Sequence, residues 1–309
     1  MNYPDYLAIG DISVDIAARV PHIPGVDEKL QVEAIGEFQG GMGANAAAAV
    51  AALGGSAGLA TSVGRDARGQ AAIDDLNRRG VDTRLIHQID DPTFWTLALL
   101  TPGGEKTLIE FPSAAISVDW NQFDWTVLKH VRFVHVIPGD IDQNERVLAE
   151  AHQHGSRSSL DLEATMFSLD DLPRRLANLD VLFMNRGCSE KIGSDLSTAA
   201  RRVRDMGPKV VVTTLGADGC FVLDRHDNET HVPGHVVHVL DTTGAGDCFA
   251  GSFAYGLLCG WDDVQCAELA NLSAAISTTA IGSREAVMDC QRLRTLAREK
   301  GYSWWEGIR

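Results

Sequence analysis

The sequence predicts an α/β protein with a mostly parallel central sheet and a small β-rich lid. Unbroken apolar runs alternate with helical stretches along most of the chain, as in strands that are buried on both faces and joined by helices. Two segments, 14–38 and 93–111, instead have strand character without intervening helices. We therefore expect a single domain over residues 1–309, in which these two segments form a lid inserted in the α/β core.

The strands of the predicted sheet are short apolar runs, expected at residues 6–10, 59–63, 131–136, 179–185, 209–215 and 237–240. The helices that separate them are expected at residues 44–53, 67–79, 142–154, 195–206 and 246–259. The first of these helices is rich in alanine, the best helix former. Gly54 and Gly55 follow it directly and supply a C-terminal stop.

The lid is predicted from a hairpin pattern. The runs FWTLALL and KTLIEF, at residues 94–100 and 106–111, flank a turn at 101–104 that contains Pro-Gly-Gly. Two long surface loops would be the alternative. We favour the lid because the apolar content of these segments is too high for solvated loops.

Composition and charge exclude several classes of function. The 309 residues carry a formal net charge of −15, whereas non-specific nucleic-acid binding requires clustered Lys and Arg. An apolar run of about 18 residues, which a transmembrane helix needs, is missing, and the N-terminus does not read as a signal peptide. The six cysteines form no C-x-x-C pair, which indicates free thiols in a reducing compartment. We expect a cytoplasmic protein with no nucleic-acid and no membrane partner.

The strongest motif is DTTGAGDCFAGSF, residues 241–253, in which Gly244, Ala245 and Gly246 stand directly before an acid and a helical stretch. Small residues let an anion approach the backbone N–H groups of a helix N-terminus, where the helix dipole favours it. Asp247 would then lie beside a transferring phosphoryl group and could take a proton from an attacking hydroxyl. From spacing alone, a capping Asp after a tight glycine turn remains an alternative.

A second glycine-rich motif, GGMGANAAAAVAALGG, occupies residues 40–55. Its glycines permit unusual backbone angles and close approach to a ligand. Asn45 opens the helix, and its amide can both donate and accept hydrogen bonds. Alone, the motif also fits a plain glycine turn capped by Asn.

Together, the two motifs resemble the signatures of the ribokinase-like, or PfkB, family of carbohydrate kinases. Residues 241–249 match its C-terminal signature, Asp-Thr-x-Gly-Ala-Gly-Asp-x-Phe, throughout. The resemblance covers essentially the whole chain and implies a ribokinase-like three-layer sandwich. It further implies ATP-dependent phosphorylation of a hydroxymethyl group on a small sugar or sugar derivative, by in-line transfer with an Asp general base. The implied cofactors are ATP and Mg²⁺, with K⁺ in some members, and a homodimer through the lid is a further expectation.

The resemblance also implies roles for individual residues. Asp247 looks like the catalytic base, and the anion hole is expected at Gly244, Ala245 and Gly246. The expected substrate contacts are Asp11, Asp15, Gly41 and Asn45. The expected nucleotide contacts are Asn185, Thr214, Gly216, Gly219 and Asn271, of which Thr214 and Asn271 fit a strand end and a polar helix face equally well. A monovalent cation is expected at Asp241, Thr243 and Gly282.

Departures from the family pattern bear on the metal and the substrate. Members often carry Asn-x-x-Glu after a late strand to place Mg²⁺ and phosphate, whereas Asn185 is followed three residues later by Cys188. Ribose-specific members tend to have Lys where Met42 stands and Glu where Ile137 stands. Ribose itself is therefore not the expected substrate.

Two other functions remain open. A nucleoside kinase on the same fold would need aromatic rings for a base, and the candidates are Phe94, Trp95 and Phe111. An acidic sugar would instead use cations, for which the candidates are Lys29, Lys106 and Arg132. A non-catalytic sugar or nucleotide sensor is the alternative of another class, although a binding protein has no need of the acid in GAGD.

Overall fold

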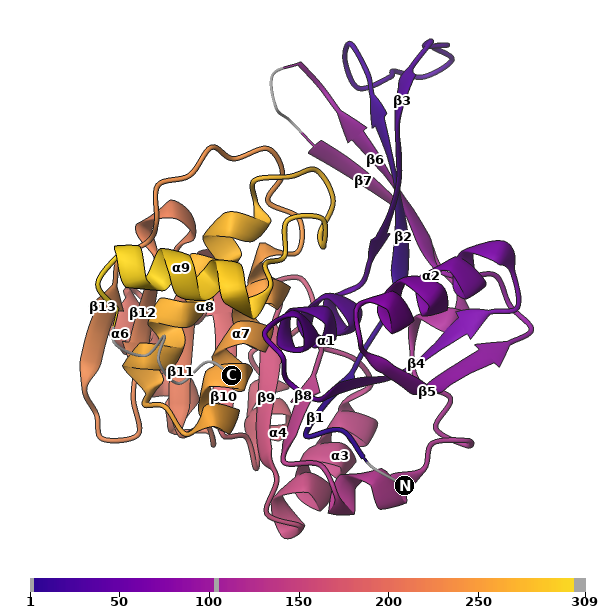
Figure 1. The fold of residues 1–309 in the computed structure, drawn as a ribbon. Coiled ribbons are helices and arrows are strands. Elements are labelled where there is room, and N and C mark those ends of the chain that lie inside the picture. Colours follow the sequence, from indigo (N-terminus) through magenta and orange to yellow (C-terminus); the bar gives the residue numbers. More distant parts are fainter. Residues whose placement is uncertain (1–2, 103–105, 303–309) are drawn as a thin grey trace.

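The computed structural model describes residues 3–102 and 106–302. In this part of the chain, nine strands form one large sheet in the order β13-β12-β11-β10-β9-β8-β1-β4-β5. A separate four-stranded sheet has the order β3-β2-β6-β7 and projects away from the large sheet (Figure 1). The predicted turn at 101–104 lies partly outside the described residues.

The large sheet is parallel except for the two pairings of β12, with β11 and with β13, which are antiparallel. Its strands are β1 (Tyr6–Ile9), β4 (Ala57–Gly64), β5 (Asp82–Ile89), β8 (Phe133–Val136), β9 (Arg157–Leu162), β10 (Val181–Asn185), β11 (Val210–Thr214), β12 (Cys220–Leu223) and β13 (Glu229–Val232). The strands of the small sheet are β2 (Ser13–Arg19), β3 (Glu33–Gly40), β6 (Trp95–Leu100) and β7 (Lys106–Phe111).

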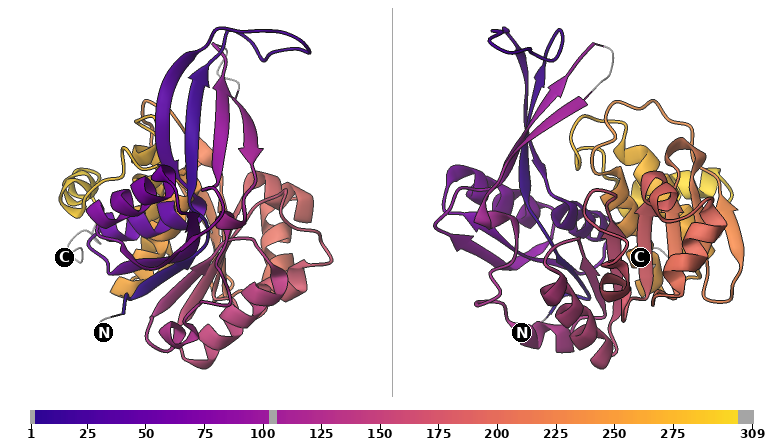
Figure 2. Two further views of the ribbon diagram at one scale, coloured as in Figure 1. Left: turned by 90° about the vertical axis from the view of Figure 1, so that its right-hand side faces the viewer. Right: turned by 180° about the vertical axis from the view of Figure 1, so that it is seen from behind.

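Helices cover both faces of the large sheet, because its central strands are apolar on both sides. Tyr6 and Ala8 of β1 point into one core, and Leu7 and Ile9 point into the other. The first core is closed by α1 (Met42–Ala52), α2 (Ala67–Arg78), α7 (Ala245–Cys259), α8 (Asp263–Ser277) and α9 (Cys290–Glu299). The second is closed by α3 (Ile141–Gln153), α4 (Leu172–Leu176), α5 (Arg186–Ile192) and α6 (Leu196–Arg204). The predicted three-layer α/β sandwich with a second β-sheet is confirmed, and Figure 2 shows its layers from two further sides.

The observed strands differ from the predicted strands in two ways. Residues 237–240 do not form a strand, because the antiparallel pair β12–β13 occupies that edge of the sheet. Val239 and Leu240 are exposed, and the Leu240 N–H donates to the Thr278 carbonyl at the end of α8. Conversely, four strands of the large sheet were not predicted: β5, β9, β12 and β13. The sequence of β9, RSSLDL, is too polar to read as an apolar run.

The helices in the described ranges include none that is both long enough and apolar enough to cross a bilayer.

Candidate active site

The candidate site lies where the parallel strands of the large sheet end. Asp11 lies two residues after β1, Asp161 lies near the end of β9, and Asn185 and Thr214 end β10 and β11. Carboxyl ends of parallel strands meet at one edge of a sheet, which is where open α/β proteins bind ligands. Asn185 and Thr214 are register partners, so the structure brings these two residues together.

Asp247 stands in the first turn of α7 and is only 8% exposed. Its Oδ2 accepts a 2.7 Å hydrogen bond from the Asn45 side-chain amide, which links the two glycine-rich motifs. Burial raises the pKa of Asp247 to about 7, and the Asn45 hydrogen bond opposes that rise. A carboxyl group with a pKa near neutrality is suited to general-base catalysis at neutral pH.

Further carboxylates surround Asp247. Asp11 and Glu163 raise its pKa further through charge repulsion. Asp161 interacts with it in the same way, and burial is the main cause that raises the pKa of Asp161 well above its usual value. Such a crowd of acids is typical of functional sites, because it is unfavourable until a cation or a proton is shared among them.

Packing within the protein requires only the first of the two glycines in GAGD. Gly244 caps α7 with a φ of 78°, and a Cβ there would lie 2.5 Å from Ser283 Cβ, so the fold itself requires glycine. A Cβ on Gly246 would meet only the Asp161 Oδ2, at 3.9 Å. Protein packing therefore does not require glycine at 246, and the absence of a side chain leaves the helix N-terminus uncovered there.

The glycine pair 40–41 brings the expected substrate residues together. Gly41 has a φ of 102° and begins α1, and a Cβ there would lie 2.6 Å from the Asp11 carbonyl oxygen. A Cβ on Gly40 would lie 2.5 Å from Asp15 Oδ2. The Asp11 Oδ1 accepts a hydrogen bond of 3.1 Å from the Gly43 N–H. Asp11 and Asp15 can thus approach the start of α1 only because this turn carries no side chains.

Asp15 lies on the small sheet, where its Oδ1 accepts hydrogen bonds from Thr96 (2.6 Å) and Ser13 (3.3 Å). Its antiparallel register partner is Phe38, so the Phe38 ring lies on the same face of the sheet as Asp15. The sequence-based analysis missed Phe38 as an aromatic candidate. The alternation of side chains between the two faces of β3 could have indicated Phe38, but this pattern is weak because most of that strand is exposed or half-buried.

Two of the three aromatic residues that were proposed for a base lie on the face of the small sheet opposite Asp15. Trp95 and Phe111 stack on each other with ring centroids 3.6 Å apart, and the Arg68 guanidinium of α2 lies 4.9 Å from the Trp95 ring. Trp95 precedes Thr96 in β6, so alternation places its side chain on the face opposite Asp15. Phe94 is buried. The stacked pair therefore does not form a slot beside Asp15.

The nucleotide residues cluster around the ends of β10 and β11. Gly216 and Gly219 have positive φ angles of 65° and 92° in the turn after β11. The Asn185 Oδ1 caps α5 by accepting from the Cys188 N–H. Asn271 of α8 donates to the carbonyls of Val232 and Pro233, so its amide holds the segment that leaves β13. The predicted nucleotide roles of these residues stay predictions.

The three residues expected to hold a monovalent cation lie together. Asp241 accepts hydrogen bonds from the Thr243 N–H and hydroxyl through Oδ1, and from the Gly282 N–H through Oδ2. Within the described ranges, no group of three or more His, Cys, Asp or Glu side chains is arranged to hold a metal ion. A cation held by backbone carbonyls in this loop stays a prediction.

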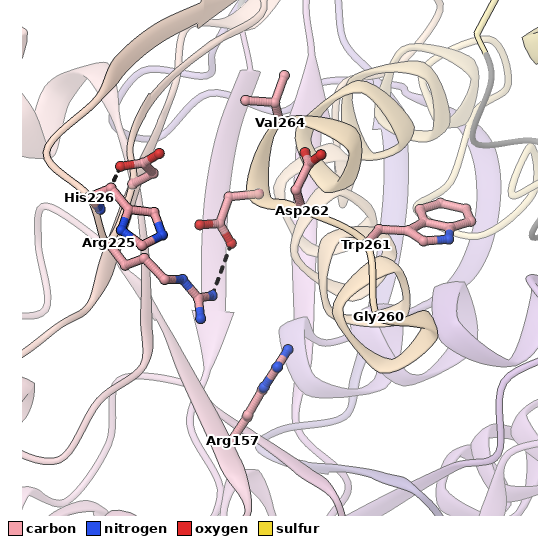
Figure 3. A pocket seen from close by; sticks show the side chains of 9 residues that line it. Arg157, Arg225, His226, Gly260, Trp261, Asp262 and Val264 are labelled. Carbon is pink, nitrogen blue, oxygen red and sulfur yellow. Dashed lines mark hydrogen bonds and ion pairs between the residues drawn. The ribbon is translucent and has the colours of Figure 1, made fainter.

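The proposed role of Arg132 was wrong. It precedes β8, at the amino ends of the parallel strands, and its Nη2 donates to the Leu258 carbonyl. A cavity of about 490 Å³ lies at the same end of the sheet, and its lining includes Arg157, Arg225, His226 and Trp261 (Figure 3). This cavity is distant from Asp247, because β9 separates Arg157 at its start from Asp161 near its end.

Sequence reasoning also missed Arg284, which is 1% exposed and contacts Asn45 directly. Its neighbours SREAV carry no glycine-rich or apolar pattern that would single it out.

The fold and the site define the class of this protein. Arabidopsis thaliana ribokinase, solved in complex with ribose and ATP, matches with a TM-score of 0.84 at 22% identity, over 96% of this chain and 99% of that one. The chain therefore has the ribokinase fold.

The family follows from the sequence comparisons. The model of the pfkB family of carbohydrate kinases matches residues 4–290, so the chain belongs to that family and is an ATP-dependent carbohydrate kinase. It is 29% identical over 282 residues to the ATP-dependent ribose-1-phosphate kinase of Halopiger xanaduensis, which covers 91% of this chain and 94% of the relative. It is 26% identical over 302 residues to the nucleoside kinase of Methanothermobacter thermautotrophicus, which covers 96% and 97%.

Proposed function

We propose that the protein transfers the γ-phosphoryl group of ATP in line to a hydroxymethyl group of a small sugar or sugar derivative, with Asp247 as the general base. The observation that carries this proposal is the buried Asp247 with a pKa of about 7, one turn into a helix whose N-terminus is uncovered at Gly246. Asp247 takes the proton of the attacking hydroxyl as the new O–P bond forms, while the bond from the γ-phosphorus to the β–γ bridging oxygen breaks and ADP leaves. The backbone N–H groups at Gly244, Ala245 and Gly246 stabilise the charge on the phosphoryl oxygens.

The substrate would be held from both sheets. Asp11 and Asp15 present carboxylates that can each accept hydrogen bonds from two vicinal hydroxyls. Gly41 would let the sugar approach the backbone, and the Asn45 amide would contact it beside Asp247. Because Asp15 belongs to the small sheet, this sheet would act as a lid that excludes water from the reaction.

The nucleotide would lie across the ends of β10 and β11, at Asn185, Thr214, Gly216 and Gly219, with Asn271 nearby on α8. The exposed Val239 and Leu240 offer apolar surface for the adenine ring. Mg²⁺ prefers oxygen ligands and keeps several waters and phosphate oxygens, so the side-chain oxygen of Asn185 would contact one of its waters. Bound Mg²⁺ would neutralise charge on the triphosphate. A cation at Asp241, Thr243 and Gly282, and a homodimer through the lid, remain parts of this proposal.

A nucleoside kinase is the second candidate, and the Phe38 ring on the Asp15 face favours it. The stacked pair Trp95–Phe111 on the opposite face weighs against a large base slot, and we therefore favour a sugar. A coupled assay of ATP turnover would decide between them, with fructose, ribose, ribose 1-phosphate, acidic ketoses, adenosine and inosine as acceptors. We expect turnover with a sugar, and a kcat on the order of 10²–10⁴-fold lower in the Asp247→Asn variant. Turnover with a nucleoside alone would overturn the substrate class, and ligand binding without any turnover would support a sensor.

A further inference from the structure

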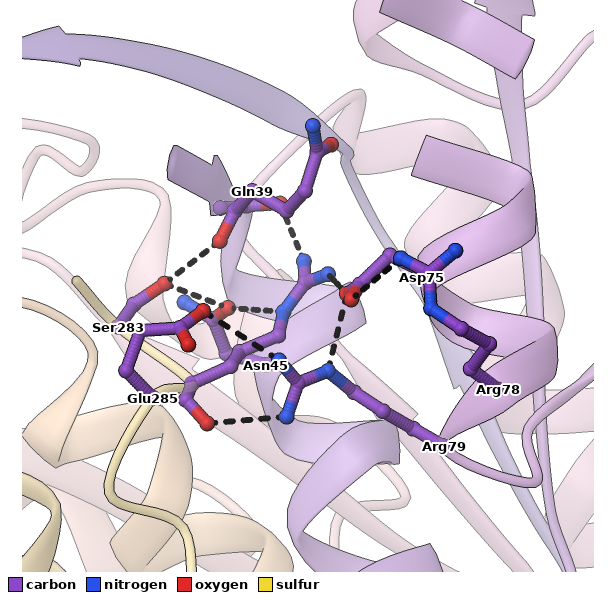
Figure 4. A network of polar contacts seen from close by, with 9 residues as sticks. Gln39, Asn45, Asp75, Arg78, Arg79, Ser283 and Glu285 are labelled. Atoms are coloured by element: carbon purple, nitrogen blue, oxygen red, sulfur yellow. Dashed lines mark hydrogen bonds and ion pairs between the residues drawn. The ribbon is translucent and has the colours of Figure 1, made fainter. Parts of the chain in front are cut away.

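Arg284 is the largest fully buried side chain of the described residues, at 1% exposed. Arginine is rarely buried, because its guanidinium carries a charge and only hydrogen-bond donors. A buried guanidinium is tolerated only where its N–H groups are paired. Arg284 therefore has partners that the fold keeps in place (Figure 4).

Three elements meet at this guanidinium. Nε donates to Asn45 Oδ1 in α1 at 2.7 Å, Nη1 donates to Asp75 Oδ2 in α2 at 3.1 Å, and Nη2 donates to the Gly40 carbonyl at the end of β3. The same side chain thus holds the glycine pair that precedes α1 and the amide that contacts Asp247.

The contact with Asn45 fixes which way its amide points. Arg284 can only donate, and the ionised Asp247 can only accept. The Asn45 oxygen must therefore face Arg284, and the Asn45 nitrogen must face Asp247, to which it donates at 2.7 Å. The Ser283 hydroxyl, 3.0 Å from Asn45 Oδ1, reinforces this orientation.

We propose that Arg284 is a positioning residue that keeps Asp247 basic at neutral pH by orienting the Asn45 amide toward it. This inference rests on the proposed function of Asp247 as the base. A hydrogen bond donated to the charged carboxylate favours that form, and a buried positive charge near it acts in the same direction. Without Arg284, the Ser283 hydroxyl alone orients the amide, the hydrogen bond to Asp247 weakens, and Asp247 holds its proton to higher pH.

The other charged or titratable groups that face Asp247 cannot replace Arg284. Asp11 after β1 and Glu163 after β9 raise its pKa, and Asp161 of β9 repels it as well. Tyr6 of β1, whose hydroxyl is buried without a hydrogen-bond partner among the described residues, is neutral. Burial is the main cause of the raised pKa of Asp247, and among the charged side chains that affect it most, Asp11, Glu163 and Arg284, the cation is Arg284.

Arg79 provides a matched control. It also pairs with Asp75, at 2.9 Å, and it donates to the Arg284 carbonyl at 3.0 Å, yet it does not contact Asn45 (Figure 4). If the role of Arg284 were purely structural, Arg284→Met and Arg79→Met would both lower stability and would both leave the pH profile of activity unchanged.

The test is the pH profile of kcat/KM between pH 5 and 9. We expect Arg284→Met to move the acid limb upward by about one pH unit. Arg284→Lys keeps a charge beside Asp75 and so protects folding, and it should move the limb in the same direction by less. Arg79→Met should lower Tm and leave the acid limb in place.

Two further variants distinguish a failure of the positioning role of Arg284 from a failure of Asp247 as the base. In Asn45→Leu, adding Arg284→Met should shift the limb by less than it does in the wild type, because Arg284 then has no amide to orient. An unmoved acid limb in folded Arg284→Lys and Arg284→Met, with Asp247→Asn inactive, would overturn the positioning role alone. Near-normal activity of Asp247→Asn would overturn the proposed base itself.

Discussion

Asp247 is the residue on which the proposed chemistry depends, and its carboxylate can be removed without changing its shape. Asp247→Asn should lower kcat by on the order of 10²–10⁴-fold, the usual contribution of general-base catalysis. ATP affinity should be nearly unchanged, because backbone N–H groups bind the phosphates. Steady-state kinetics and titration with a non-hydrolysable ATP analogue measure the two effects. A variant that kept more than half of the wild-type kcat would rule out the assignment.

From the burial of Asp247 we also predict how the stability of the protein depends on pH. Its pKa is about 7 in the folded protein against 3.8 when exposed, so the folded state binds more protons in this range. The free energy of unfolding should therefore fall as pH rises from about 4 to 7, and the full cost should be present above pH 7. Asp247→Asn should consequently be more stable than the wild type at pH 8, by up to about 4 kcal/mol, and similar at pH 4. Urea unfolding at both pH values measures the difference, and equal destabilisation at both would contradict it.

At the scale of elements, two glycines at the N-terminus of α7 are needed for different reasons, one for function and one for packing. Gly246→Val should fold normally, since a Cβ there meets little of the protein, but its branched side chain should block the phosphoryl group and lower kcat at least tenfold. Gly244→Ala should instead lower Tm, because this position has a positive φ and lies against Ser283. Thermal unfolding and turnover of both variants distinguish the two effects. Normal kcat in folded Gly246→Val would show that this turn is not the anion hole.

Local signals were sufficient for the elements that meet at Asp247. The motif around Gly244 and the helix after Asn45 each lie within about a dozen residues, so spacing alone indicated an anion site. The contacts of Arg284 could not be predicted from local signals, because its partners Asn45 and Asp75 lie 239 and 209 residues away along the chain. Strand β9 was missed for a different reason, since its buried serines, Ser158 and Ser159, make hydrogen bonds to Asn178 and His135 that the sequence does not display.

At the scale of the whole molecule, the proposed site is divided between two sheets. Asp15 belongs to the small sheet, whereas Asp247 and the strand ends belong to the large α/β core. A substrate that contacts both would link the two sheets, and we expect the small sheet to close over it and exclude water from the site. The edges of the small sheet, β3 and β7, each have a strand partner on one side alone within that sheet, so their backbone N–H groups are candidates for ligand-dependent protection.

Hydrogen–deuterium exchange tests this closure directly. With the sugar that supports turnover and a non-hydrolysable ATP analogue, amides of β2, β3, β6 and β7 should exchange more slowly, whereas the analogue alone should slow exchange mainly around β10, β11 and α8. Asp15→Asn weakens the contact through which the small sheet holds the sugar, so protection of the small sheet should require higher sugar concentrations in this variant. The matched control is Glu37→Gln, which changes an exposed carboxylate of β3 that pairs with Arg68. It should behave like the wild type. Unchanged exchange of the small sheet at saturating sugar and analogue would show that it is a fixed wall of the site and not a lid.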